Sequence, residues 1–303
     1  MRNSFALCVK DLADRDSNIR LLVGDIGFRI FDSFLEFHSE KFINCGIAEQ
    51  NMISVAAGMA SEGLKVFVYT ITPFLIMRAY EQIRVDLGIN ASNVVLVGVG
   101  AGLAYDKLGP THHSYEDIAL MRCIPNLNIL TPYDGPSTRD CILKAYKDLG
   151  SASSYVRLSK GGEKSLSSPS ESTTYYDLWN TKESTSTCVV CHGSIASRYV
   201  DSIKQNKLNY NVLVIKEISN LAVYTLADRL KTYGQAKVIF CEEAFSIGSL
   251  FELFSVYNRD KNSNLLIGQV CLQYKYIYDV LDRESLLDYY FFRPEDLLEV
   301  KCS

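Results

Sequence analysis

The sequence has little that would support a metal site, a membrane span or nucleic-acid binding. It contains only four histidines and neither a CxxC…CxxC nor an HExxH spacing, so a zinc site would need cysteines from distant segments. No apolar run approaches the roughly 18 to 20 residues that a membrane-spanning helix requires. A formal net charge of -4 gives no electrostatic reason to expect a nucleic acid or an anionic membrane as partner. A GxSxG nucleophile elbow is also absent.

The amino-terminal segment and the cysteines both indicate a cytoplasmic protein. Residues 1–16 (MRNSFALCVKDLADRD) hold no apolar run of signal-peptide length before the acidic residues begin. The nine cysteines are odd in number and have no regular spacing, which fits a reducing compartment better than a disulfide framework. We therefore expect the chain to act in the cytoplasm.

What the sequence does contain is a regular alternation of β-rich apolar runs and helical patterns. Residues 51–63 and 73–88 have helical patterns that end at Gly63 and Gly88. Strands that alternate with helices predict a parallel sheet covered by helices on both faces. In the first half, the predicted strands are residues 21–24, 65–69, 93–99, 127–130 and 153–158.

A polar segment rich in Ser and Thr interrupts the alternation near the middle of the chain. Beyond it, strand and helix patterns resume, beginning with TCVVCHG (187–193) and ending with NLLIGQV (264–270). A chain of 303 residues is long enough for two cores. We predict two three-layer α/β/α domains, residues 1–165 and 186–303, joined by a linker at 166–185.

Two short motifs are typical of cofactor sites, but their contexts favour simpler explanations. CVVCH (188–192) matches a c-type haem attachment pattern, yet it lies in a strand-like run without an export signal, which favours a buried strand. The same context argues against a redox CxxC pair. GVGAG (98–102) follows a strand but continues into a loop, whereas a dinucleotide site needs a helix there. Its glycines permit a tight turn at the strand end where α/β sheets place ligands.

Three motifs in the first half follow one another in a distinctive order. They are NCGIAEQNM (44–52), PFLIMRAYEQIR (73–84) and GPTHHSYEDIALMRCIPNL (109–127). Glu49, in the first motif, is an acid among apolar residues with no basic residue nearer along the chain than Lys41. A carboxyl group in such surroundings favours its protonated form. An acid that stabilises a helix N-terminus is the alternative interpretation from position alone.

The ordered set resembles the transketolase family, specifically its pyrimidine-binding domain followed by its C-terminal domain. EEAFSIGSL (242–250) resembles a segment of that second domain more weakly, because no histidine follows the two acids. The resemblance implies thiamine diphosphate, whose thiazolium C2 must become a carbanion. It also implies that residues 1–165 form the thiamine diphosphate pyrimidine-binding domain.

By this resemblance, Glu49 is the acid that hydrogen-bonds the pyrimidine N1′ and favours the imino tautomer whose nitrogen takes the C2 proton. Phe74 matches the aromatic residue that stacks on the aminopyrimidine ring, with an ordinary core residue as the alternative. Ile71, Thr72 and Met77 would complete the wall of that pocket.

Further residues are carried over from the same resemblance. His112 matches the histidine that contacts the cofactor-bound substrate fragment and could donate to a substrate oxygen. His113 stands where the family commonly has Gln, and Lys160 falls near a basic residue that contacts sugar phosphate. Asp25 matches an acid near the cofactor or subunit interface, or is an exposed turn residue. Residues 101–105 (AGLAY) replace a histidine-bearing stretch of transketolases proper, which leaves the donor and acceptor substrates open.

The family's GDG…N-type motif, which binds the diphosphate and its divalent metal, is absent. Because the diphosphate needs a metal to neutralise it, we expect an N-terminal diphosphate-binding subunit that holds Mg²⁺. We expect an α2β2 heterotetramer that transfers a ketol (glycolaldehyde) unit between sugars or sugar phosphates. One alternative is a subunit of a deoxyxylulose phosphate synthase-like or 2-oxo-acid decarboxylating or dehydrogenase enzyme. The other is a non-catalytic homologue that only binds a partner.

Overall fold

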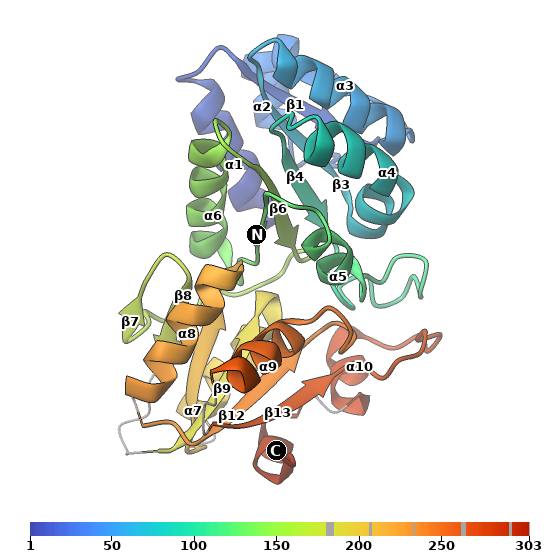
Figure 1. Ribbon diagram of the computed structural model, residues 1–303. Helices are drawn as coiled ribbons and strands as arrows, with labels where there is room; N and C mark the ends of the chain where they lie inside the picture. The colour runs from blue at the N-terminus through green and yellow to red at the C-terminus, as the bar shows by residue number, and fades with distance from the viewer. Residues whose placement is uncertain (180–184, 206–207, 233, 262–264, 291–292, 303) are drawn as a thin grey trace.

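The computed structural model describes residues 1–179, 185–205, 208–232, 234–261, 265–290 and 293–302. Two α/β domains lie one above the other in Figure 1, the first running from blue to green and the second from yellow to red. Each is built on one sheet, with strand orders β11-β5-β6-β4-β3-β1-β2 and β13-β12-β9-β10-β8-β7. The predicted fold class, two α/β domains in tandem, is confirmed.

The first sheet is parallel except at one edge, where β11 pairs antiparallel with β5. Its central strands are continuous apolar runs, as expected of strands covered on both faces; every residue of β4 is buried. All five predicted strands of this half are present. The strands are β1 (Ile19–Val23), β2 (Phe42–Asn44), β3 (Lys65–Ile71), β4 (Val95–Val99), β5 (Leu127–Leu130), β6 (Ser153–Leu158) and β11 (Glu217–Ile218).

Helices cover both faces of this sheet. On one face α1 (Arg2–Ala13), α2 (Asp32–His38) and α6 (Gly135–Asp148) enclose one core cluster. On the other face lie α3 (Glu49–Ser61), α4 (Tyr80–Gln82) and α5 (Asp117–Arg122).

The helix predicted over 73–88 is present, but most of it is π-helical. Phe74–Arg78 and Ile83–Ile89 form π-helical segments on either side of α4. The predicted apolar face is buried at Ile76, Ile83 and Leu87, whereas Tyr80 is half-buried and donates its hydroxyl to the carbonyl of Leu120. π-Helical turns recur at functional sites, where they change which side chains face a pocket.

The second sheet is also covered on both faces, by α7 and α10 on one and by α8 and α9 on the other. CVVCH forms β9, and both of its cysteines are buried, which confirms the strand interpretation. The strands are β7 (Glu171–Ser172), β8 (Tyr176–Trp179), β9 (Thr187–His192), β10 (Asn211–Ile215), β12 (Lys237–Glu242) and β13 (Leu266–Cys271). The helices are α7 (Ala196–Gln205), α8 (Asn220–Thr232), α9 (Leu250–Asp260) and α10 (Arg283–Tyr289).

The junction between the sheets is more interwoven than a plain linker. The predicted linker, 166–185, contains β7 and β8 of the second sheet, and its residues 180–184 lie outside the described part of the chain. β11, which follows β10 of the second sheet, pairs back onto the first sheet. The proposed division at residues 165 and 186 stays a prediction. No helix in the described ranges combines the length and the apolar character needed to cross a membrane.

Candidate active site

Glu49 is the first residue of α3 and lies at the carboxyl ends of β1 and β3. Its carboxylate is almost completely buried, with a side-chain exposure of 1%. A Cβ atom added at Gly24 would lie 2.7 Å from Thr70 Oγ1 and 3.7 Å from Glu49 Oε1, so any side chain there would crowd this corner. The fold therefore places a buried acid at the edge where parallel α/β sheets bind ligands.

Arg78 is the nearest partner of that acid. Its Nη1 donates to Glu49 Oε2 at 2.6 Å, and its guanidinium carbon lies 4.5 Å from the centre of the Phe74 ring. Glu49 has no basic neighbour along the chain, as the sequence indicates, but in space it is ion-paired, because the first π-helical segment carries Arg78 over it. Expecting an acid with only apolar surroundings was therefore wrong.

Phe74 links this pair to the predicted substrate loop. Its ring is half-buried, and its centre lies 5.1 Å from that of His112, edge to face. His112 in turn lies 5.9 Å from the Tyr105 ring, and its Nδ1 is 3.0 Å from Thr111 Oγ1. Burial lowers the pKa of His112, which favours the neutral imidazole near neutral pH.

His113 is buried where His112 is not. Its exposure is 1%, and its Nδ1 shares a short hydrogen bond with the Tyr115 hydroxyl. Burial lowers the pKa of His113, while hydrogen bonding at Asp106 and the charge of Glu243 oppose that shift. Its Nε2 has no hydrogen-bond partner among the residues that the structure describes. This histidine therefore supports the loop from beneath.

The remaining predicted site residues lie around this cluster. Lys160 is exposed, with its Nζ 5.3 Å from the centre of the Tyr105 ring. Asp25 is exposed at a left-handed φ of 56° and accepts a hydrogen bond from Asn44, so its backbone is that of a turn. Ile71 is half-buried at the end of β3, and Met77 is 38% exposed beside Arg78. Their roles stay predictions.

Arg78 is the site residue that sequence reasoning missed. It lies in the motif PFLIMRAYEQIR, four positions after Phe74, and residues four apart are neighbours on a helical surface. That spacing could have suggested a contact between Arg78 and Phe74. In the described residues, no group of three or more His, Cys, Asp or Glu is arranged to hold a metal ion.

The comparisons with known proteins agree with this geometry. The model of the family "Transketolase, pyrimidine binding domain" matches residues 1–162, more than half of the chain. The chain belongs to the transketolase family. It is 39% identical over 142 residues to one subunit of the apulose-4-phosphate transketolase of Phocaeicola vulgatus, which covers 46% of each protein. It is 29% identical over 263 residues to transketolase-like protein 1 of Bos taurus, covering 84% of this chain. The matched regions span less than half of these relatives, 46% and 43%.

Solved structures of the family extend the likeness to both domains. A structure described as "split gene transketolase, inactive beta4 tetramer" is 25% identical, with a TM-score of 0.79 over 98% of this chain and 95% of that one. Transketolase from Campylobacter jejuni is 17% identical, with a TM-score of 0.77 over 98% of this chain and 45% of that one, a likeness of fold alone.

A pyrimidine-binding domain implies thiamine diphosphate, and the residues around Glu49 fit its pyrimidine part. The guanidinium of Arg78 shows that a flat group with N–H donors fits against both the Glu49 carboxylate and the Phe74 ring. Thr70 Oγ1, buried beside the same corner, has no hydrogen-bond partner within the described ranges. A buried acid, an aromatic face and an unpaired hydroxyl are suitable groups for a polar aromatic ring.

Proposed function

We propose that this chain is the C-terminal, pyrimidine-binding subunit of a two-subunit transketolase. When bound, thiamine diphosphate would supply the carbanion and the electron sink for cleaving and forming carbon–carbon bonds. The protein would supply orientation and proton transfer, and would pass a two-carbon ketol unit from a ketose to an aldose. The observation that carries the proposal is the juxtaposition of Glu49 and Phe74 around one planar group.

Glu49 and Phe74 would hold the pyrimidine ring. The Glu49 carboxyl would share a proton with N1′, since a carboxyl group excluded from water exchanges a proton with a bound base more readily than with solvent. Phe74 would orient the ring by an offset or edge contact. Ile71 and Met77 would line the wall, and Asp25 would act near the cofactor or the subunit interface.

His112 would act on the substrate. A neutral imidazole can donate to an oxygen that develops negative charge, and lowering of the His112 pKa by burial favours that form. Its contact with Phe74 places it beside the cofactor-binding groups. His113 would support it, and Lys160 would contact a substrate phosphate. Because the relative from Phocaeicola vulgatus is named for apulose 4-phosphate, we infer a phosphorylated sugar as substrate.

A second chain would complete the enzyme. We propose that an N-terminal subunit binds the diphosphate and Mg²⁺. The relatives named for apulose 4-phosphate are each one subunit of a transketolase, which supports a division of the enzyme between chains. Two copies of each chain would form a heterotetramer in the cytoplasm, paired through the pyrimidine-binding domains.

The direct test is reconstitution. The purified chain is mixed with the N-terminal transketolase subunit of the same organism, thiamine diphosphate and Mg²⁺, and ketol transfer is assayed with apulose 4-phosphate and other ketose phosphates. We expect activity only in the complete mixture. Full activity of the chain alone would contradict the split site. Consumption of pyruvate with release of carbon dioxide would favour a decarboxylating enzyme, and no cofactor binding by the complex would favour a non-catalytic homologue.

A further inference from the structure

The loop that carries His112 and His113 is closed at its base by a pair of backbone hydrogen bonds. Gly102 N donates to the Ser114 carbonyl at 3.1 Å, and Ser114 N donates to the Gly102 carbonyl at 2.9 Å. The segment between them, residues 102–114, belongs to the first domain. Its base nevertheless contacts the second domain, at the residue that follows β12.

That residue is Glu243. It is 3% exposed; its Oε1 accepts the backbone N–H of Leu103 at 2.7 Å, and its Oε2 accepts from Arg283 Nη2 at 2.6 Å. Gly102 has a φ of +59°, and a Cβ atom there would lie 2.4 Å from Glu243 Cδ. The loop can therefore approach this carboxylate only because residue 102 is glycine.

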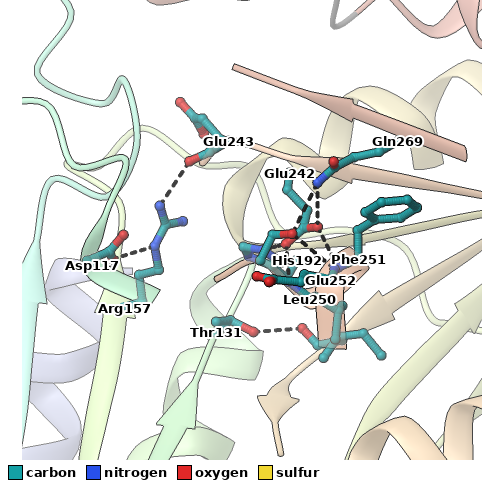
Figure 2. Close-up of polar contacts among 12 residues, drawn as sticks. Asp117, Thr131, Arg157, His192, Glu242, Glu243, Leu250, Phe251, Glu252 and Gln269 are labelled. Atoms are coloured by element: carbon teal, nitrogen blue, oxygen red, sulfur yellow. Dashed lines mark hydrogen bonds and ion pairs between the residues drawn. The ribbon is translucent and has the colours of Figure 1, made fainter. Parts of the chain in front are cut away.

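Arg157 joins the same two segments from the other side. Its Nε donates to Asp117 Oδ2 at 2.7 Å, and its Nη2 donates to the carbonyls of Ser114 at 3.3 Å and Glu243 at 3.1 Å. Figure 2 shows the guanidinium of Arg157 between Asp117 and Glu243. One buried cation thus holds the end of the loop against the strand end that carries Glu243.

A third contact secures the loop further along. The backbone N–H of Arg283, the first residue of α10, donates to Asp106 Oδ2 at 3.1 Å. Arg283 therefore binds the loop with its backbone and binds Glu243 with its side chain. Paired charges in a buried setting fix the geometry of the groups they join, because separating them leaves each unpaired away from water.

We propose that Glu243 is a positioning residue of the active site, through which the second domain holds the loop 102–114 and so places His112. This rests on the proposed function for its catalytic consequence, but not for the anchoring itself. It gives the second domain, which contributes none of the predicted site residues, a part in substrate binding.

The neighbouring residue Glu242 provides a matched control. It is equally buried, but its carboxylate bonds stay within the second domain, to His192 Nε2 at 3.2 Å and to the backbone N–H groups of Leu250 at 2.8 Å and Phe251 at 2.9 Å (Figure 2). Burial opposes ionisation of Glu242, but these hydrogen bonds and the charge of His192 lower its pKa. Glu242→Gln alters a comparable buried acid without touching the loop.

The first experiment needs no activity. Hydrogen–deuterium exchange by mass spectrometry on the intact chain follows peptides that cover residues 101–116. Glu243→Ala should speed their exchange by about tenfold or more, because the loop base opens more often. Glu243→Gln keeps an oxygen acceptor for Leu103 and should restore most of the protection. Glu242→Gln should leave these peptides unchanged. Unaltered exchange in Glu243→Ala would overturn the proposal.

The second experiment uses the reconstituted two-subunit enzyme. Glu243→Ala should raise the KM for the ketose phosphate by about tenfold while the dissociation constant of thiamine diphosphate stays within about twofold, because Glu49 and Phe74 lie on other segments. Parallel weakening of cofactor and substrate would indicate general distortion and overturn the proposal. If the parent enzyme transfers no ketol unit while exchange in Glu243→Ala is accelerated, the proposed function fails and the anchoring role stands.

Discussion

Arg78 and Glu49 form an ion pair in which an exposed guanidinium covers an almost completely buried carboxylate, with Nη1 and Oε2 2.6 Å apart. The same guanidinium lies over the Phe74 ring. Both groups that would hold an aminopyrimidine are therefore already engaged by one side chain of the chain itself. A ring that stacks on Phe74 and bonds Glu49 has to displace Arg78 from at least one of them.

We expect Arg78→Gln to bind thiamine diphosphate more tightly in the reconstituted enzyme. If the pair is closed about nine-tenths of the time, releasing it lowers the apparent dissociation constant about tenfold. Isothermal titration calorimetry measures this directly. Arg84→Gln, which removes the same charge from an exposed position in the next turn, should leave the constant unchanged. Weaker binding by Arg78→Gln would show instead that Arg78 helps to hold the cofactor.

Glu49→Gln should abolish most ketol transfer while the chain still assembles with its partner. An amide cannot exchange a proton with N1′ as a carboxyl group does, and loss of a general acid–base group costs about 10²–10⁴ in rate. Steady-state assays measure the rate, and size-exclusion chromatography measures assembly. Glu62→Gln, an exposed acid just beyond the other end of α3, is the control. An unaffected rate would remove Glu49 from the mechanism.

His113 should make the fold less stable in mild acid. Because burial lowers its pKa below the ordinary 6.5, the unfolded chain takes up a proton before the folded chain does. Stability should therefore fall as the pH drops below about 6.5, by at most about 1.4 kcal/mol per pH unit for this one group. Urea unfolding at about pH 7.5, 6.5 and 5.5 should show a smaller acid loss in His113→Gln. A difference between the two proteins that is constant with pH would contradict this.

The surface beside the buried acid should be covered by another chain. Ile47, two residues before Glu49, is 75% exposed, and Phe28 is 78% exposed. Introducing a charge there should weaken association, because a charge in an interface core loses its hydration. We expect Ile47→Glu to lower the mass measured by light scattering of the chain alone or with its partner. Leu266→Glu, at an exposed position of the second sheet, should not. An unchanged mass in Ile47→Glu would place the interface elsewhere.

Much of the fold could be predicted from the sequence, because buried parallel strands are short apolar runs that stand out from their surroundings. β4, β5 and β6 lie within or at the predicted ranges. The helical content of 73–88 was also predictable, but its π-helical register was not, since it depends on packing against the sheet. No prediction covers α1 or α6, although both enclose one of the main core clusters.

For the site, the sequence identifies residues but not their partners. Glu49, Phe74 and His112 were found from motifs, and the structure brings the last two into contact. The ion pair of Glu49 with Arg78 depends on how a helix and a strand end meet. The bond between Glu243 and Leu103 joins residues 140 positions apart in different domains, and no spacing rule reaches that far.

The short strand β11 limits how far the two halves can be treated as interchangeable modules. The chain leaves the second sheet after β10, adds Glu217 and Ile218 to the free edge of β5, and returns through α8. A fragment that ended after residue 165 would expose that edge, and an unpaired strand edge invites association with other chains. Any recombinant that joins this first half to a different second half must supply a strand to seal β5. The boundary between the two halves is therefore a shared sheet edge and a poor place to cut.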